Sequence, residues 1–355
     1  GASLVIERGG KFLSAGCTFQ AGCDEPWLGI QVEGNTANHD QNYVQALPMD
    51  QRQGWLWLTE DSEVSGAAIG VLCGRMDGTG MHPDYYGGVV RAMASTFRNC
   101  GTGAMIMRYE RRNTSGAELD NLSRFTNCSF LTDAAWHDLY AAGPGFQVHL
   151  DDVHGIRLDN CSFRNLDPET FQPGGQGWGI YSFFAGFHVL GNSTPATAFQ
   201  NMGVGIVAFS GATETYSVDR MTFENNMAGI YDMMGIAPRI TRNVFHVPDQ
   251  GDLPRAPLGL LLNQSTAYVV EENQFIGNTG TSSVGIGFLG EQMANNQIYN
   301  NEFTHLTVGT MVAGRHKGNV PGHEYDGLQI LCGDYLANTT DLGLWMFSYI
   351  RQDQG

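Results

Sequence analysis

A short phrase, in which a bulky apolar residue is followed by polar residues and Asn, recurs along the whole chain. Its clearest copies are TFENN at 222–226, QFIGN at 274–278, SFRN at 162–165, TFRN at 96–99 and AFQN at 198–201. Aligning the copies places the bulky residue at Phe19, Val64, Phe97, Phe130, Phe163, Phe199, Phe223, Phe245, Phe275, Phe303 and Leu336. Self-similarity at a period of about 20 to 50 residues is typical of repeat architectures. The sequence therefore predicts a solenoid.

Each repeat contains a second apolar column with the alternation expected of β-strands. Five positions before the Phe stand Leu158, Val218, Ile240, Val270 and Ile298. Polar residues alternate with them, and no stretch shows the spacing of an amphipathic helix. At about 3.3 Å per residue, short strands joined by tight bends close one coil in about 22 to 25 residues. Longer spacings predict inserted loops at 35–54, 131–145, 166–177 and 246–258.

Coils of this kind stacked in parallel predict an all-β fold, a right-handed parallel β-helix of about 10–11 coils with 1–355 as a single domain. The Phe column then faces inward, one ring above another. Asn residues that follow Phe are expected in bends, where Asn tolerates the left-handed backbone region. An amide ladder is expected from Asn243, Asn273 and Asn301.

The repeat also places glycines and cysteines. A Gly precedes many of the Ile strands, as in Gly229-Ile230, and is expected to supply a bend that side chains would block. Cys17, Cys128 and Cys161 each stand two positions before a Phe. They are predicted to form one inward column of small apolar side chains.

Four phrases of the repeat carry a resemblance to known proteins. They are WLGIQV at 27–32, SGAAIG at 65–70, STFRN at 95–99 and GLQILC at 327–332. With them the chain resembles the right-handed parallel β-helix proteins of the pectate-lyase-like superfamily, and within it the large cell-surface β-helix proteins of Bacteroidota that use type IX secretion. The resemblance implies the fold and a secreted or cell-surface location. It implies no activity, because one fold hosts many functions.

Composition restricts the partners. The chain carries a net charge of −17, from 19 Lys and Arg against 36 Asp and Glu. Nucleic acid is excluded because binding it requires a basic surface, and acidic polysaccharides are disfavoured because like charges repel. The carboxylates leave calcium binding open, but no other cofactor and no specific metal site is predicted. No apolar run of about 18 residues occurs, so no membrane span is predicted.

Both ends of the chain are apolar. It opens on SLVI at 3–6 and closes on LWMFSYI at 344–350. Solenoids need polar caps at their ends. We therefore expect the chain to be a segment of a longer surface protein.

The densest polar chemistry lies between residues 136 and 159. The candidates are His149, Asp151, Asp152 and Arg157. A His near carboxylates can act as general base or acid, and an Arg could stabilise a sugar enolate. Two neighbouring acids could serve a glycosidase. We predict that these are the polar residues of an ordinary turn, and no catalytic residue is assigned.

The alternation of the strand decides where these candidates point. Because adjacent coils lie about 4.8 Å apart, His149, Asp151 and Arg157 are expected to share a solvent-facing patch. Phe146, Val148 and Leu150 are predicted to face inward, and Gln147 and His149 outward.

Apolar residues also occupy outward positions. In four consecutive repeats the residue after the Gly-Ile step is Tyr181, Val207, Tyr231 and Leu261, and two positions later come Phe183, Phe209 and Met233. Contiguous exposed apolar patches usually mark contacts. One interpretation is that a loop of the chain covers this stripe, or that a β-bulge reverses the alternation. The other is that it docks a protein partner or stacks on sugar rings, with Tyr181, Phe183, Phe209, Tyr231 and Met233 as the ligand- or partner-binding residues.

The leading functional hypothesis is a secreted or cell-surface structural and adhesion module with no evident catalytic site. A polysaccharide lyase or glycoside hydrolase with a groove along the β-helix is the first alternative. A filament-forming subunit is the second, because β-helix ends carry unpaired strands. Partners are expected to be a glycan or a surface protein.

Overall fold

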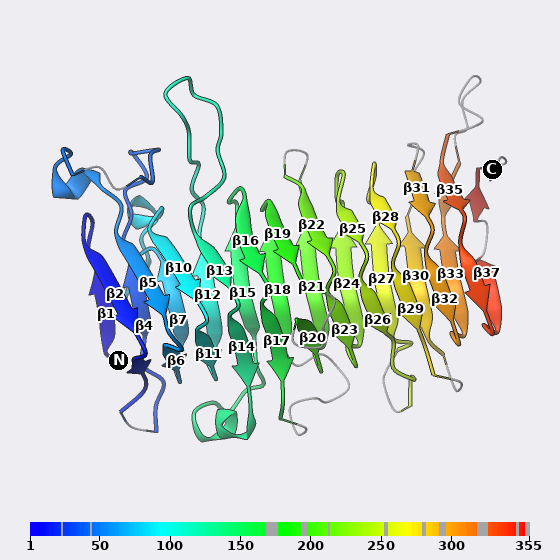
Figure 1. Cartoon of the computed structure of the whole chain (residues 1–355), viewed down its shortest axis with the longest axis horizontal. Coiled ribbons are helices and arrows are strands. Elements are labelled where there is room, and N and C mark those ends of the chain that lie inside the picture. The colour runs from blue at the N-terminus through cyan, green and yellow to red at the C-terminus, as the bar shows by residue number, and fades with distance from the viewer. Residues whose placement is uncertain are drawn as a thin grey trace. The chain divides into compact units, whose positions relative to one another are not determined.

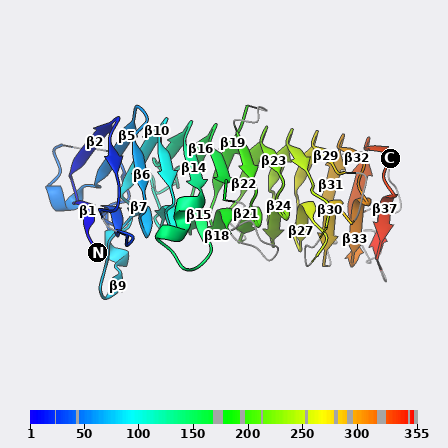
Figure 2. The ribbon, with the colours of Figure 1, turned by 90° about the horizontal axis from the view of Figure 1, so that it is seen from below.

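The computed structural model describes residues 1–22, 24–42, 45–167, 177–192, 197–211, 214–251, 255–278, 282–290, 296–317, 326–345 and 348–351. These residues form two compact units. Unit 1 covers 1–167 and 180–188, and unit 2 covers 177–179 and 189–351. Each unit is built of coils of three short strands, and strands of successive coils lie side by side (Figures 1 and 2).

Unit 1 contains parallel strands of three sheets, which we call A, B and C. Sheet A has β1 (Ser3–Ile6), β4 (Gly29–Val32), β7 (Ile69–Cys73), β12 (Thr102–Ile106) and β15 (Phe146–Asp151). Sheet B has β2 (Lys11–Ala15), β5 (Trp55–Thr59), β10 (Val89–Met93), β13 (Arg124–Thr126) and β16 (Ile156–Asp159). Sheet C has β3 (Thr18–Phe19), β6 (Glu63–Ser65), β11 (Thr96–Arg98), β14 (Ser129–Thr132) and β17 (Ser162–Asn165).

Unit 2 repeats the same order of sheets. Sheet A has β21 (Val204–Phe209), β24 (Ala228–Met233), β27 (Leu258–Asn263), β30 (Val284–Leu289), β33 (Val308–Ala313) and β37 (Thr340–Leu344). Sheet B has β22 (Tyr216–Asp219), β25 (Arg239–Thr241), β28 (Val269–Glu271), β31 (Asn296–Tyr299) and β35 (Leu328–Leu331). Sheet C has β20 (Ala198–Gln200), β23 (Thr222–Glu224), β26 (Val244–His246), β29 (Gln274–Ile276), β32 (Glu302–Thr304) and β36 (Asp334–Leu336).

The remaining elements are short. Residues of both units occur in β18 (Trp178–Phe183) and β19 (Phe187–Leu190). Two further strand pairs are β8 (Met76–Asp77) with β9 (Gly80–Met81), and β34 (Arg315–His316) with β38 (Tyr349–Ile350). The described residues also form three 3₁₀ helices, η1 (Met49–Gln51), η2 (Pro83–Tyr85) and η3 (Ala134–Asp138). The predicted all-β, right-handed parallel β-helix is confirmed. The single-domain assignment stays a prediction.

The inserted loops fall where repeat spacing predicted them in the described chain. The insert at 35–54 lies between β4 and β5 and contains η1, and the insert at 131–145 follows β14 and contains η3. A third separates β26 from β27, whereas 168–176 of the predicted loop at 166–177 lie outside the described residues. Repeat spacing did not predict the long loop at 107–123 between β12 and β13. This loop stands away from the coils in Figure 1.

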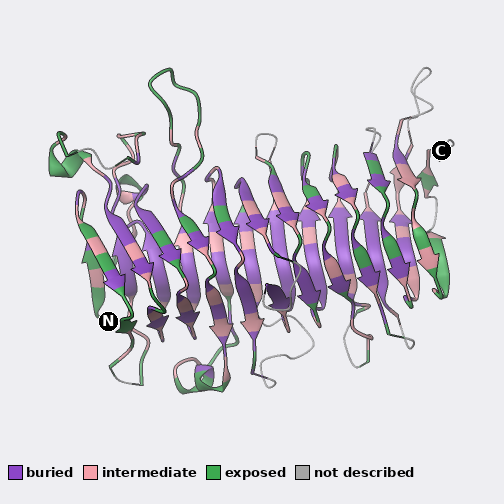
Figure 3. Cartoon of the chain, in the orientation of Figure 1, coloured by how far each residue is buried: buried purple, intermediate pink, exposed green. Residues whose placement is uncertain are grey.

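The Phe column forms the core of each unit, as predicted. In unit 1 the rings of Phe97 and Phe130 stack with centroids 4.8 Å apart, and those of Phe130 and Phe163 are 5.1 Å apart. In unit 2 the stack runs through Phe199, Phe223, Phe245, Phe275 and Phe303. These distances match the spacing of neighbouring strands, about 4.8 Å. The parallel register therefore determines how the rings stack. Buried residues concentrate in the strands (Figure 3).

Leu336 does not belong to the column, contrary to the repeat alignment. Tyr335 pairs with Phe303 in the sheet register, and their rings stack at 4.7 Å. Leu336 is 62% exposed. Tyr335 takes the position in the column because it also supplies a large flat ring. Its hydroxyl lies 3.0 Å from Thr310 Oγ1. At the other end of the alignment Phe19 is half-buried and pairs with Val64.

The predicted amide ladder is confirmed. The backbone N–H and the Nδ2 of Asn243 both donate to Asn273 Oδ1 at 3.0 Å. Asn273 donates to Asn301 Oδ1 in the same way, again at 3.0 Å. All three side chains are buried. The ladder therefore satisfies the polar groups of a turn that lies inside the stack. Asn residues two positions after Phe, such as Asn201 and Asn225, have the expected positive φ.

The glycines before the Ile strands have a different role from the one predicted. Gly229 lies inside β24 and forms no bend. A Cβ placed on it would lie 2.4 Å from the Gly259 carbonyl oxygen and 2.7 Å from the ring of Phe245. Glycine is therefore required because the strand packs against the Phe column without space for a side chain.

The cysteine column holds only in part. Cys128 and Cys161 are buried, as predicted, and burial raises the pKa of the Cys161 thiol. Cys17 is exposed. It belongs to the first described coil, whose strand β3 has a sheet neighbour on one side only in the described part of the chain.

Candidate ligand-binding site

The polar cluster at 149–157 is split between two sheets. His149 and Asp151 lie on β15 of sheet A, whereas Arg157 lies on β16 of sheet B. Asp152 occupies the turn between them with a φ of 48°. The expected solvent-facing patch of His149, Asp151 and Arg157 is therefore wrong, because the chain turns a corner of the coil between the strands.

His149 belongs to an aromatic cluster instead. Its ring lies 5.5 Å from that of Phe146 and 5.2 Å from that of Tyr181, and Phe146 stacks on Tyr181 at 4.7 Å. Burial lowers the pKa of His149, and the charge of Asp151 opposes this shift.

The prediction that Phe146 faces inward is therefore wrong. The pairing of β12 with β15 is interrupted at Gln147, and this irregularity shifts the alternation. Gln147 is buried rather than outward, and its Nε2 donates to the Arg164 carbonyl oxygen at 3.0 Å. Val148 and Leu150 face inward, as predicted.

The two remaining candidates form ion pairs near the surface. Arg108 Nε lies 2.9 Å from Asp152 Oδ2, and Arg157 Nη2 lies 3.6 Å from Asp159 Oδ1. The Arg108–Asp152 pair is exposed and contributes little to stability, whereas the carboxylate of Asp159 is buried. Catalytic roles for His149, Asp151, Asp152 and Arg157 stay untested.

The residues of the apolar stripe differ in their exposure. Ile206 and Ile230 are fully buried in unit 2, and exposure alternates only after Ile230, where Asp232 is buried between two half-buried residues. Val207 is 4% exposed, whereas Tyr231 is half-buried. Phe209 and Met233 pair in register and are both half-buried, so the stripe is exposed in part only.

In unit 1, Tyr181 is half-buried under Phe146, and Phe183 is 38% exposed. The predicted binding role of Tyr181, Phe183, Phe209, Tyr231 and Met233 stays a prediction.

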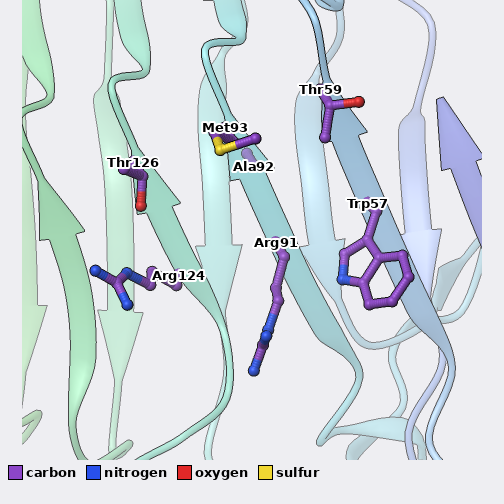
Figure 4. Close-up of a pocket in the computed structure, with 7 residues that line it drawn as sticks. All are labelled: Trp57, Thr59, Arg91, Ala92, Met93, Arg124 and Thr126. Carbon is purple, nitrogen blue, oxygen red and sulfur yellow. The ribbon is translucent and has the colours of Figure 1, made fainter. Parts of the chain in front are cut away.

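The outer face of sheet B in unit 1 has a hollow that the sequence did not predict. It has a volume of about 430 Å³, and Figure 4 shows its lining residues on three adjacent strands. They are Trp57 and Thr59 from β5, Arg91, Ala92 and Met93 from β10, and Arg124 and Thr126 from β13.

Strand alternation explains why these side chains face outward. Leu56 and Leu58 are buried in β5, so Trp57 between them lies on the opposite face. In the same way Phe125 is buried in β13, and Arg124 before it is exposed. The interior takes the apolar residues, and the large polar and amphipathic ones are left for the outer face.

The sheet register brings the cationic residues into one row. Arg91 pairs with Trp57 on one side and with Arg124 on the other, and Arg124 pairs with Arg157. We call Arg91, Arg124 and Arg157 the arginine row. All three are exposed. The row was detectable, because each of its members stands six positions before a Phe of the repeat.

Trp57 forms the aromatic end of the hollow, and the buried Trp55 lies near it on the same strand. Their rings meet edge to face, with centroids 5.8 Å apart. The guanidinium of Arg91 lies 5.3 Å from the Trp55 ring, and Lys11 Nζ lies 5.5 Å from the Trp57 ring. Cations above indole faces at these distances are attracted by the ring quadrupole.

Asp159 provides negative charge at the other end. Its side chain is only 6% exposed and contacts the guanidinium of Arg124 as well as that of Arg157. Arg91 forms no ion pair within the described residues, and its Nε donates to the Leu122 carbonyl oxygen at 3.3 Å. Two of the three guanidinium groups of the row therefore contact the same carboxylate.

Comparison with known proteins gives one distant structural likeness. No protein-family model and no curated protein matches the chain. Among solved structures, the Streptococcus pneumoniae surface protein and adhesin PfbA is similar, with a TM-score of 0.37 and 10% sequence identity over 97% of this chain and 91% of that chain. None of the helices in the described residues has the length and apolar character needed to cross a membrane.

Proposed function

We propose that the chain is a non-catalytic, glycan-binding adhesion module of a secreted or cell-surface protein. The observation that carries the proposal is the hollow on sheet B, where the half-buried indole of Trp57 lies beside the guanidinium of Arg91. An indole face suits the apolar face of a sugar ring, and guanidinium groups donate hydrogen bonds to sugar oxygens. The hollow is open and lies on regular strands, which suits a rigid binding surface.

The location of the protein is part of the same proposal. The resemblance to the large β-helix proteins of Bacteroidota implies export to the cell surface. It further implies that export follows the type IX secretion route. Calcium binding by surface carboxylates stays a further prediction.

The test is a binding and turnover assay of the whole chain on a panel of neutral and acidic polysaccharides. We expect binding without new reducing or unsaturated ends. Trp57→Ala should weaken binding at least about fivefold, since stacking on an aromatic face is worth roughly 1 kcal/mol or more. Trp345→Ala is the matched control, because Trp345 is an exposed tryptophan of unit 2.

Two results would contradict the proposal. If no polysaccharide binds, the chain is not a glycan-binding module. If new chain ends accumulate during incubation, the enzymatic alternative takes its place.

A further inference from the structure

We infer that Cys128 and Cys161 become joined by a disulfide, which links two neighbouring coils of unit 1 when the protein folds in an oxidising compartment. Both residues are thiols in the structure. Disulfides form and persist outside the cytoplasm, so the bond rests on the secreted or cell-surface location in the proposed function. It gives the two cysteines a role beyond that of small apolar side chains in the core.

The sheet register places the two cysteines at the same point of consecutive coils. Thr126 pairs with Asp159 before them, and Ser129 pairs with Ser162 after them. Between these pairs the Ser162 N–H donates to the Cys128 carbonyl oxygen at 2.9 Å. Neighbouring strands lie about 4.8 Å apart, and a disulfide joins Cα atoms about 4.4–6.8 Å apart. The spacing of the coils therefore meets the requirement of the bond.

The two turns also direct their side chains the same way. Asn127 and Asn160 precede the cysteines, and their φ angles are 54° and 53°. Because the two turns share this conformation, both cysteine side chains project into the core in parallel, where they are buried. The thiols of Cys128 and Cys161 meet there in a side-chain hydrogen bond. The sulfur atoms are therefore in contact without any movement of the backbone.

The corresponding position of the repeat links coils by a different means in unit 2. It is occupied there by the amide ladder, whose members also stand two positions before a Phe and bond each coil to the next. In unit 1 the Cys128 thiol donates to the Thr126 carbonyl oxygen of its own coil at 3.5 Å. The Cys161 thiol donates in the same way to the Asp159 carbonyl oxygen at 3.6 Å. The disulfide supplies the strong link between coils that the amides supply in unit 2.

Formation of the bond needs an oxidant, and its chemical class is a small-molecule or protein disulfide. One cysteine thiolate attacks a sulfur of that disulfide, forms a mixed disulfide and displaces one thiol. The other cysteine thiolate then attacks the sulfur of the first cysteine and displaces the second half of the oxidant as a thiol. The two cysteines lose two electrons and two protons in total, and the two departing thiols carry both away.

Burial determines when the bond forms. Cys128 is 2% exposed and Cys161 is fully buried, and burial raises the pKa of Cys161. Exchange requires a thiolate that the oxidant can reach, so the pair reacts while the coils are open during folding. After the coils close, the same burial shields the bond from reductants. The disulfide therefore holds the two coils together under conditions that reduce exposed disulfides.

Tryptic mapping tests the pairing directly. The whole chain is refolded in a mixture of reduced and oxidised glutathione, its remaining thiols are blocked with N-ethylmaleimide, and it is digested without reduction. Trypsin cleaves after Arg124, Arg157 and Arg164, and the sequence has no other Lys or Arg between them. Peptides 125–157 and 158–164 then carry one of the two cysteines each. We expect them as a single cross-linked mass, which separates into the two peptides on reduction.

Melting temperatures test whether the bond links the coils. It closes a loop of 33 residues, the difference between the numbers of the two cysteines. Protein refolded with glutathione should melt about 5 °C higher than protein refolded with a phosphine reductant, because the loop restricts the unfolded chain. Cys128→Ser and Cys161→Ser should each abolish this difference, with alanine as the second choice if serine prevents folding. Cys73→Ser is the matched control and should retain it, since Cys73 is equally buried but pairs with Ile106.

Three results would overturn the disulfide. The first is recovery of both peptides as separate, alkylated species after oxidative refolding. The second is pairing of either cysteine with the exposed Cys17 or Cys332 instead. The third is a melting temperature that is the same in oxidised and reduced protein. The thiol measurements do not depend on glycans, so if the cross-link forms while the whole polysaccharide panel fails to bind, the glycan-binding proposal fails and the disulfide stands.

Discussion

Asp232 is an ionisable residue in a core made of apolar side chains. It lies between the outward residues Tyr231 and Met233 and is fully buried. Burial raises the pKa of its carboxyl to about 6, and the hydroxyls of Ser265 and Tyr216 lower it in part. The sequence did not reveal this residue, because an acid at an inward position breaks the pattern that identifies inward positions.

Asp232→Asn should stabilise the protein at neutral pH. The raised pKa means that the folded state binds the proton more tightly than the unfolded state, so stability is present below about pH 4 and is lost as the pH rises through about 6. Removing the charge should contribute at most about 3 kcal/mol at pH 7.5. Urea denaturation at pH 4 and pH 7.5 measures the difference, which should vanish at the lower pH. An equal effect at both pH values, or one shared by the exposed control Asp334→Asn, contradicts the assignment.

At the scale of the element, the turn between sheets B and C shows how a polar residue can be part of the core. The ladder of Asn243, Asn273 and Asn301 satisfies backbone and side-chain donors from one coil to the next. Each Nδ2 also donates to a backbone carbonyl oxygen, such as Ile240 O for Asn273. The side-chain Nδ2 of each ladder residue therefore has a backbone acceptor within the stack.

Asn273→Ala should destabilise the protein by about 2–4 kcal/mol, because the backbone N–H and the Nδ2 of Asn243 lose their shared acceptor in a buried site. Thermal unfolding followed by circular dichroism measures the loss. Asn278→Ala is the control on the same coil, since Asn278 is exposed. Similar melting temperatures for the two variants would mean that the ladder adds no net stability.

At the scale of the whole molecule, stability depends on contacts between neighbouring coils. Solenoid stability is approximately a sum of repeat terms and nearest-neighbour interfaces. Phe223 shows this in unit 2, where its ring contacts Phe199 at 4.9 Å and Phe245 at 4.6 Å. One ring thus belongs to two interfaces.

Phe223→Ala should cost about 3–5 kcal/mol through the cavity it leaves. Hydrogen exchange should quicken first in β20, β23 and β26, because these strands contain the stacked rings. Leu336→Ala is the control and should cost under about 0.5 kcal/mol, since Leu336 is largely exposed. A large cost at Leu336 would instead support the repeat alignment that places Leu336, and not Tyr335, in the Phe column.

The inward columns were predictable from the sequence because burial imposes a period. A buried position in a coil must be apolar in every repeat, so Phe223, Ile240 and their equivalents recur at fixed intervals, and the bend Asn243 recurs with them. Fold class, most loops and the ladder follow from that recurrence alone. The arginine row carries the same kind of signal, six positions before three Phe residues, but outward positions vary freely and the row was not distinguished from ordinary surface charge.

The tertiary structure decided the features that depend on register and on corners. Phe146 and Gln147 exchanged their expected faces because the pairing of β12 with β15 is interrupted there. His149 and Arg157 were separated because a turn carries the chain from sheet A to sheet B. Trp57 and Arg91 came together because parallel pairing joins residues 34 positions apart, counted from their numbers. Sequence periodicity determines which residues are buried, whereas the neighbours of an exposed residue are set by the number of residues in each inserted loop and by the register that the coils then adopt.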